Sequence, residues 1–280
     1  MRRLAPAIFS ALLLCACSHS KSVAPTYMVS IEPQREILEA LVDSGTEVVA
    51  MLERGADPET FEPSMSRRAL ADHALAYFAS GVLPFEEKLR AGTSTPFYDT
   101  SIGLVPIYGT HTHSGNVHHV EVPDPHYWTS VSGLRLMARN MADALVELQP
   151  AEESSIRRRQ ARLEARLDSI DAALRSRLAA VPTRVFAVWH PSLSYYARDY
   201  SLTQITLGQE GKEMSPRHIR QAIDSAKANS VRVFFIQREY DTRQAEAINA
   251  GVSSRLITID PLAYRWEDEL NKITDELIRP

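Results

Sequence analysis

The chain has 280 residues, 44% of them hydrophobic and 24% charged, with a formal net charge of −4 at pH 7 when histidine is neutral. This balance lacks the basic footprint of a nucleic-acid-binding protein, so no nucleic-acid partner is expected. Both cysteines lie at the start of the chain, at Cys15 and Cys17. A metal site elsewhere in the chain must therefore use nitrogen and oxygen donors.

The N-terminus has the pattern of a processing segment. Arg2 and Arg3 precede an apolar run at 7–14 that is too short to span a bilayer. The sequence at 14–17, Leu-Cys-Ala-Cys, resembles a bacterial lipobox. A cut at this lipobox would remove two arginines and no acid and change the formal charge from −4 to −6.

We therefore predict a lipoprotein signal peptide at 1–16 and a polar tether at 17–25. Cys17 is the predicted lipid-bearing residue, and its acyl chains would hold the protein on a membrane surface. Cys15 is the alternative, although Leu14 before it is large for a cleavage position.

The next part of the chain predicts strands that alternate with helices. Ser64 is placed to cap a helix that reaches His73. Such alternation indicates a parallel sheet with crossover helices. The strands are predicted at 27–31, 47–52, 76–79 and 96–100, and the helices at 34–44, 64–73 and 84–90.

Two long helices are predicted in the middle of the chain. The first is expected from Asp124 to about Leu148. The second covers 151–180 and carries apolar residues at heptad-like spacings. Its thirty residues would span roughly 45 Å, long enough to cross from one lobe to another. A coiled-coil partner helix is the alternative explanation for this stripe.

The alternation of strands and helices resumes after Pro182. The mature chain therefore suits two small α/β lobes or one large α/β domain. The strands are predicted at 184–188, 203–207, 231–236 and 255–259, and the helices at 193–200, 215–227, 242–249 and from about 266 to 277.

Four polar residues occupy positions where a site is expected to form. Glu59 lies in the loop after one predicted strand, His190 directly follows another, and Asp260 follows a third. His126 opens a helix behind a long loop. Ligands of open α/β sheets bind outside the carboxyl ends of the strands. Two imidazoles and two carboxylates would fill a four-coordinate shell.

A histidine-rich stretch precedes His126. Residues 109–128 contain five of the nine histidines of the chain. Imidazole is the commonest metal-ligating side chain. The candidates for weak auxiliary metal capture are His111, His113, His118 and His119, and a polar surface loop is an equally good explanation for them.

The combined motifs resemble the metal-binding receptors of bacterial zinc/manganese ABC importers, a lipoprotein family known as the cluster A-I receptors. The similarity covers nearly all of the mature chain. The motifs are GADPETFEPS at 55–64, the histidine-rich loop followed by DPHYW at 124–128, WHPSLSYYARDY at 189–200 and TIDPLA at 258–263.

The resemblance implies two small α/β lobes with parallel sheets joined by one long rigid helix. It implies an N-terminal lobe at 26–149, a connecting helix at 150–181 and a C-terminal lobe at 182–280. It also implies a lipid-anchored receptor on the periplasmic face of a bacterial membrane. The expected partners are the permease and ATPase of an ABC importer, and we expect a monomer.

The resemblance implies metal ligation by His126, His190 and Asp260. Glu59 departs from the family pattern, which has histidine after Asp-Pro; either Glu59 replaces that imidazole or the site holds three protein ligands and a water. The histidine-rich loop favours Zn²⁺, whereas two carboxylates tolerate Mn²⁺ or Fe²⁺. We expect Zn²⁺, with Mn²⁺ or Fe²⁺ as the alternative.

Each ligand has a simpler explanation. Glu59 is also explained as a loop charge or a helix-capping partner, and His126 as a helix cap working through Asp124. His190 would then be a hydrogen-bonded core histidine, and Asp260 the start of the last helix. The remaining histidines, His19, His73 and His218, are expected at the surface.

Capture rather than catalysis is the predicted activity, because a full protein shell leaves no position for a reactive water. A lipid-anchored metallohydrolase using His126, His190 and a carboxylate, with Glu59 as general base, is the alternative from another class. The sequence contains no His-Glu-x-x-His pair and no Gly-x-Ser-x-Gly elbow to support it. A surface adhesin that keeps the receptor fold without transport is a third possibility.

Overall fold

The computed structural model describes residues 26–110, 121–208 and 213–280. The predicted signal peptide, the tether, Cys17 and the four auxiliary histidines at 111, 113, 118 and 119 lie outside these ranges. Among the described helices, none is both long and apolar enough to cross a membrane.

The N-terminal part folds as a four-stranded parallel sheet with the strand order β2-β1-β3-β4. Its central strands are apolar and buried, as expected of a sheet covered on both faces. Ser64 caps α2 by accepting a hydrogen bond from the backbone of Arg67, as predicted. The elements are β1 (Thr26–Val29), α1 (Glu32–Glu39), β2 (Glu47–Ala50), α2 (Met65–Asp72), β3 (Ala76–Ala79), α3 (Pro84–Gly92) and β4 (Phe97–Asp99).

A short antiparallel hairpin, which we did not predict, follows this sheet. Its strands are β5 (Tyr108–Thr110) and β6 (Glu121–Pro123), and Tyr108 pairs with Pro123. The hairpin flanks the histidine-rich segment and leads directly to His126.

The helix predicted from Asp124 begins later than expected. A 3₁₀ turn, η1, covers Tyr127–Thr129, and α4 covers Val131–Leu148. The start is set by Ser130, whose hydroxyl accepts a hydrogen bond from the backbone of Gly133. The prediction of a helix starting at Asp124 was therefore wrong, and His126 lies in the turn before the helix.

The C-terminal part contains a second parallel sheet, with the order β10-β9-β7-β8. Strand β9 is buried along its whole length. The elements are β7 (Val185–Val188), α6 (Ser194–Asp199), β8 (Thr203–Thr206), α7 (Pro216–Ala228), β9 (Val233–Gln237), α8 (Arg243–Val252), β10 (Arg255–Ile259) and α9 (Trp266–Ile278).

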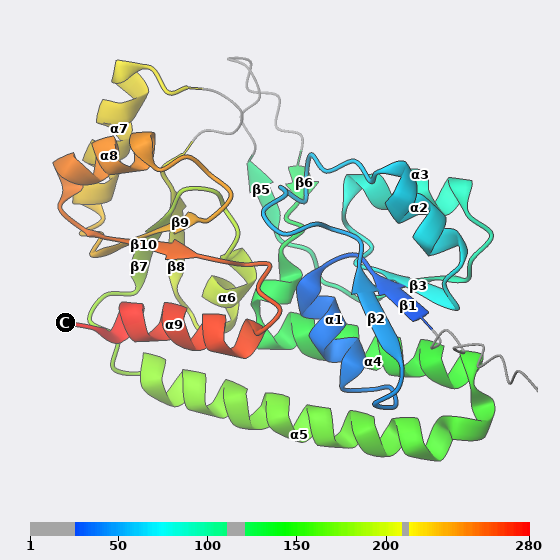
Figure 1. Ribbon diagram of the computed structural model, residues 1–280. Coiled ribbons are helices and arrows are strands. Elements are labelled where there is room, and N and C mark those ends of the chain that lie inside the picture. The colour runs from blue at the N-terminus through cyan, green and yellow to red at the C-terminus, as the bar shows by residue number, and fades with distance from the viewer. Residues whose placement is uncertain (1–25, 111–120, 209–212) are drawn as a thin grey trace, which may run out of the picture.

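The long helix α5 (Glu153–Leu178) follows a 3₁₀ turn, η2 (Pro150–Glu152), and runs along the base of both sheets (Figure 1). In its N-terminal half, Arg159 donates to the carbonyl of Leu41. In its C-terminal half, Arg177 pairs with Asp275 of α9. Its buried stripe consists of Ile156, Leu163, Leu167, Ile170, Leu174 and Leu178. The heptad-like spacing therefore belongs to a helix packed against both lobes of its own chain, as predicted for the connector.

One residue of α5 ties the lobes together directly. Arg166 contacts Glu36 of α1 at 3.0 Å and Glu267 of α9 at 2.6 Å. Its guanidinium also lies over the ring of Trp266, 5.0 Å from the centroid. The precise boundaries of the lobes, 26–149 and 182–280, stay a proposal.

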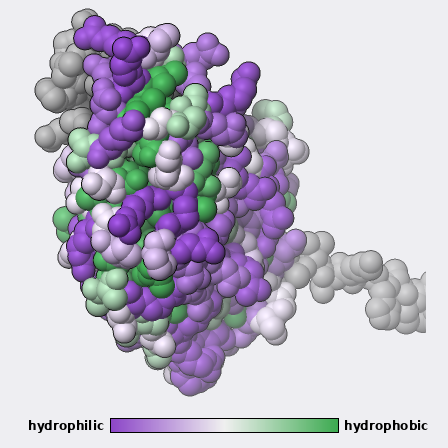
Figure 2. All heavy atoms as spheres, turned by 90° about the vertical axis from the view of Figure 1, so that its left-hand side faces the viewer, coloured by the Kyte–Doolittle hydropathy of each residue, from purple (hydrophilic) through white to green (hydrophobic). Residues whose placement is uncertain are grey.

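The hydrophobic core is continuous between the lobes along α4 and α5. Among the described residues, a separate cluster lies in the outer layer of the C-terminal lobe, where Trp189, Phe234 and Ile248 pack with other residues of α7 and α8. Viewed from the side of the C-terminal lobe, the surface is mostly hydrophilic and is crossed by a strip of hydrophobic side chains (Figure 2).

Candidate metal site between the lobes

Three side chains from distant parts of the sequence meet between the two sheets. Glu59 follows β2, His126 follows β6, and His190 follows β7. Each offers one ligand atom, and the three atoms all lie within 4.8 Å of one another. Glu59 Oε1 lies 3.3 Å from His190 Nε2 and 3.9 Å from His126 Nε2.

These distances suit a tetrahedral ion. Bonds of about 2.0–2.1 Å at tetrahedral angles place neighbouring donors about 3.3 Å apart. The pair formed by Glu59 and His190 has this separation, and the pair formed by Glu59 and His126 needs a shift of roughly half an ångström to reach it. The three donors, all within 4.8 Å of one another, can therefore close around a single cation through side-chain adjustments.

His126 is oriented by Asp124. The Asp124 carboxylate accepts hydrogen bonds from the backbone N–H of His126 at 2.8 Å and from its ring Nδ1 at 2.9 Å. With Nδ1–H pointing to a carboxylate, the lone pair of Nε2 faces the other two donors. Burial by itself raises the pKa of Asp124, but the hydrogen bonds from the ring and the backbone of His126 counter it, and the pKa is lowered.

The turn that carries His126 is anchored on both sides. A Cβ on Gly133 would lie 1.9 Å from the carbonyl oxygen of Tyr127, so only glycine permits α4 to approach the turn this closely. From the other lobe, the carbonyl of Pro261 accepts a hydrogen bond from Trp128 Nε1 at 3.1 Å. Tyr195 of α6 donates to the carbonyl of Asp124 at 2.9 Å. Both lobes therefore fix the position of this imidazole.

His190 is held by its neighbour in the sheet. The side-chain amide of Gln237, at the end of β9, accepts from the backbone N–H of His190 at 3.3 Å and donates to its carbonyl at 2.6 Å. The ring of Tyr240 stacks on the imidazole with 5.5 Å between centroids. His190 and His126 meet edge to face, 5.0 Å apart.

Glu59 is placed by an ordered turn. Gly55 has a φ of 83°, which favours glycine at the bend that leaves β2. The Asp57 carboxylate then accepts a hydrogen bond from the backbone of Glu59 at 2.9 Å. Farther along, Phe61 packs edge to face on Phe85 of α3, with 5.2 Å between the ring centroids. The loop therefore directs Glu59 towards the imidazoles.

Asp260 is not brought into this group. Its carboxylate forms an ion pair with Arg238 Nη1 at 2.7 Å, and its other oxygen accepts from the backbone of Leu262 at 3.2 Å. The strand order β10-β9-β7 places Asp260 two strands away from His190. At about 4.8 Å per strand this is roughly 10 Å between main chains.

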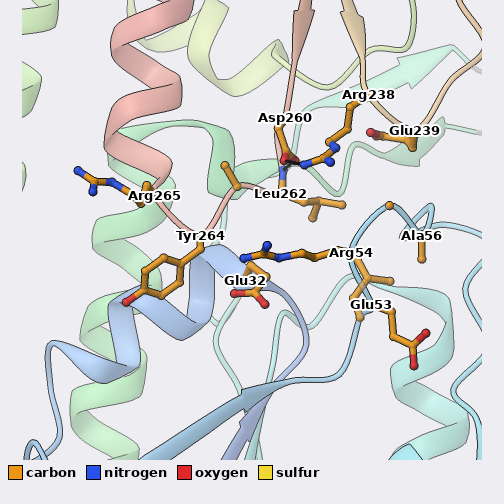
Figure 3. Close-up of a pocket in the computed structure, with 13 residues that line it drawn as sticks. Glu32, Glu53, Arg54, Ala56, Arg238, Glu239, Asp260, Leu262, Tyr264 and Arg265 are labelled. Carbon is orange, nitrogen blue, oxygen red and sulfur yellow. Dashed lines mark hydrogen bonds and ion pairs between the residues drawn. The ribbon is translucent and has the colours of Figure 1, made fainter.

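A cavity of about 300 Å³ lies next to Asp260 between the two lobes. Figure 3 shows Arg238 and Asp260 facing each other at this cavity, with Arg54 extending across it from the N-terminal lobe. Glu239 also lines it. Burial raises the pKa of Glu239, and the charges of Asp260 and Asp57 raise it further. The cavity is therefore surrounded by charges of both signs.

The comparisons with known proteins agree with the fold described above. Residues 28–275 match the family described as zinc-uptake complex component A, periplasmic. The chain belongs to this family. Its fold and its lobes joined by a long helix are those of the cluster A-I metal-binding receptors. Zinc-uptake component A proteins are periplasmic solute-binding proteins of ABC importers, not enzymes.

Individual relatives show the range of the family. The chain is similar to a crystal structure of ZnuA, with 32% identity, a TM-score of 0.82, and coverage of 91% of this chain and 99% of that one. It is 25% identical over 269 residues to a putative metal-binding protein of Treponema pallidum (strain Nichols), covering 88% of this chain and 85% of the relative. An iron-binding protein of Yersinia pestis, YfeA, is 27% identical over 132 residues, covering 46% of this chain and 42% of the relative.

Some residues that shape the site of this zinc-uptake component A homologue were not predicted from its sequence. The signal for Asp124 was present, because it stands two residues before His126 in Asp-Pro-His. Gln237 and Tyr195 carried no such signal, since their roles depend on strand pairing and on packing between the lobes. The auxiliary histidines lie outside the described residues.

Proposed function

We propose that this protein captures Zn²⁺ between its two lobes through Glu59, His126 and His190, and delivers it to the permease of an ABC importer. The convergence of these three donor atoms within 4.8 Å supports the proposal most directly. Membership in a family of periplasmic metal-binding receptors supports the transport role.

The donor set favours zinc. Two neutral imidazoles and one carboxylate are borderline ligands, and the stability order of the divalent metals places Zn²⁺ above Mn²⁺ and Fe²⁺ at such a site. Relatives named as a zinc-binding protein and as an iron-binding protein support a fold that accommodates several metals. Mn²⁺ and Fe²⁺ are therefore the competitors against which the preference of this chain is measured.

A water molecule completes the proposed shell, because three protein donors leave one tetrahedral position open. Capture rather than catalysis is therefore supported by membership in a family of solute-binding proteins and not by a full protein shell. An open position also offers a route for ligand exchange when the ion is handed on. Since α5 packs against both lobes, and Arg166 bridges α1 and α9, we expect small changes on binding. A rotation of the lobes by tens of degrees between metal-free and zinc-bound crystals would contradict this expectation.

Titration calorimetry of purified protein tests the ligands. We expect one tight zinc equivalent in the parent, which is lost in His126→Ala and in His190→Ala. The control is His218→Ala on exposed helix α7, which should bind as the parent does. Zinc at 100 times the dissociation constant should stabilise the parent by roughly 2.7 kcal/mol, and this gain should vanish with the tight site. Unaltered zinc affinity in both ligand variants would refute the assignment.

The histidine-rich loop is proposed as a weaker collector beside the tight site. Deletion of 110–119 should leave one tight zinc equivalent and remove weaker additional ones. Loss of the tight equivalent would show that a ligand of the main site lies within the deleted segment.

Anchoring at Cys17 is proposed from the lipobox alone. Cys17→Ala should abolish incorporation of labelled fatty acid and release the protein from the membrane fraction. Labelling that persists in Cys17→Ala and disappears in Cys15→Ala would assign the anchor to Cys15.

A further inference from the structure

Asp260 has the chemistry of a fourth ligand but lies outside the three-donor group, where its carboxylate pairs with Arg238. Arg238 Nη1 lies 2.7 Å from Asp260 Oδ2, and the backbone N–H of Leu262 occupies Oδ1 at 3.2 Å. Both carboxylate oxygens therefore have donors without any contribution from the metal site.

The sheet keeps this pair together. The backbone N–H of Arg238 donates to the carbonyl of Ile259 at 3.0 Å, which places residue 238 beside residue 260 where β9 and β10 end. The backbone N–H of Asp260 donates to Glu269 of α9 at 2.9 Å. Because the main chains at both residues are fixed, the side chains meet without a loop having to close.

The pair is nevertheless separable. The side chain of Arg238 is 54% exposed and that of Asp260 is 25% exposed, so water can replace either partner at low cost. The cavity of about 300 Å³ beside them gives the Asp260 side chain room to turn. Glu239 follows β9, which lies between β10 and β7 in the sheet, and it lines the same cavity as Asp260.

We propose that Arg238 sets the metal preference of this receptor by holding Asp260 outside the coordination shell. With Asp260 paired to Arg238, the ion has one carboxylate and two imidazoles. Once Asp260 is released, a second carboxylate can join, and the donor set becomes harder and larger. Such a set favours Mn²⁺ relative to Zn²⁺. The inference rests on the proposed function, because it concerns the same ion.

Substitution of Arg238 tests the proposal. Arg238→Gln removes the guanidinium, and we expect the ratio of Mn²⁺ affinity to Zn²⁺ affinity, measured by competition with a chelator, to rise about tenfold. The ratio is the informative quantity, because removing a positive charge raises the affinity for both divalent ions equally and leaves their ratio unchanged.

Arg54→Gln is the matched control. Arg54 lines the same cavity, has the same charge, and forms no ion pair with any described residue. We expect its ratio to equal that of the parent. An equal rise in Arg54→Gln and Arg238→Gln would overturn the proposal, since it would indicate a general effect of charge.

Asp260 completes the mutant cycle. Asp260→Asn alone should change zinc affinity by less than about threefold, because the carboxylate does not ligate in the parent. In the double variant Arg238→Gln, Asp260→Asn, the manganese gain should disappear. A loss of zinc affinity of about tenfold or more in Asp260→Asn would overturn the proposal by showing that Asp260 ligates despite Arg238.

The outcomes separate this inference from the function on which it rests. If the parent binds no divalent metal tightly, the proposed function fails. If the parent binds zinc tightly and the ratio is the same in Arg238→Gln, only the role of Arg238 fails. Should Arg238→Gln not fold, the single Asp260→Asn variant decides by the limits given above.

Discussion

The two imidazoles and the two carboxylates predicted for the metal site are held in different ways. The side chains of His126 and His190 are 5% exposed, whereas those of Glu59 and Asp260 are 28% and 25% exposed. The ring of His126 is hydrogen-bonded to Asp124, whose backbone is held from the other lobe, and the backbone of His190 is hydrogen-bonded to the neighbouring strand. The acids extend from a loop and from a strand end.

This difference separates two tasks. In the proposed site the buried imidazoles would fix where the ion sits, because Asp124 orients the ring of His126 and Gln237 holds the backbone of His190 before any ion arrives. The acids are more exposed and can reach other partners, as Asp260 does with Arg238. We expect changes near the imidazoles to alter the affinity for every metal, and changes at the acids to alter the choice among metals.

The largest expected effect comes from the partner of His126. Asp124→Asn replaces the carboxylate that orients the ring, and zinc affinity should fall by about 10–100-fold, or about 1.4–2.7 kcal/mol. Calorimetry would measure it, with Asp143→Asn on the exposed face of α4 as control. An affinity equal to the parent's would mean that His126 does not need this hydrogen bond.

A smaller effect is expected at the exposed acid. Glu59→Gln removes the only carboxylate of the three-donor group, so zinc affinity should fall by about tenfold and manganese affinity by more. Glu62→Gln is the matched control, since Glu62 lies in the same loop and pairs with Lys88 instead. Equal losses of zinc and manganese affinity would contradict the expectation that the acids determine the choice among metals.

We expect the hydrogen bond that anchors the turn at 127–129 to the other lobe to contribute to the free energy of unfolding. Trp128→Phe removes the hydrogen bond to Pro261 between the lobes, and the free energy of unfolding should fall by about 1 kcal/mol more than in Trp266→Phe. Trp266 is also buried, but its Nε1 has no hydrogen-bond partner among the described residues. Denaturant unfolding of the metal-free proteins would measure the difference, and equal losses would show that the ring's volume alone matters.

The smallest effect concerns acid stability. The pKa of Asp124 is lowered in the folded protein below its ordinary value. Its stabilising contribution is therefore complete above the unfolded pKa and is lost as the pH falls through the folded value. The stability advantage of the parent over Asp124→Asn should shrink below about pH 4 in metal-free protein. An advantage that stays constant down to pH 2 would show that Asp124 does not titrate with folding.

The parts of the fold that were predictable are those with a long pattern. The stripe of α5 repeats over seven turns' worth of residues at 153–178, and the strands on both sides of it are apolar runs bounded by turn residues. The hairpin was missed because β5 and β6 have three residues each, too few for an alternating pattern. The start of α4 was placed too early because the cap at Ser130 follows a 3₁₀ turn that resembles the first turn of a helix.

The same reasoning explains what the sequence showed of the site. Glu59, His126 and His190 were found because each follows a strand or a recognisable motif, and the structure brings these three together. The ion pair between Arg238 and Asp260 was not foreseen, because its partners are 22 positions apart and meet only through the pairing of β9 with β10. Local spacing carries no information about such a neighbour.

The hairpin of β5 and β6 has a consequence for how this receptor can diversify. The paired strands close off residues 111–120 before the chain reaches His126, so insertions or deletions between them leave the ligand in register. Doubling the length of such a closed loop costs only about 0.6 kcal/mol in chain entropy. The histidine-rich segment can therefore lengthen, shorten or change its histidine content over generations while the proposed ion-binding centre stays intact.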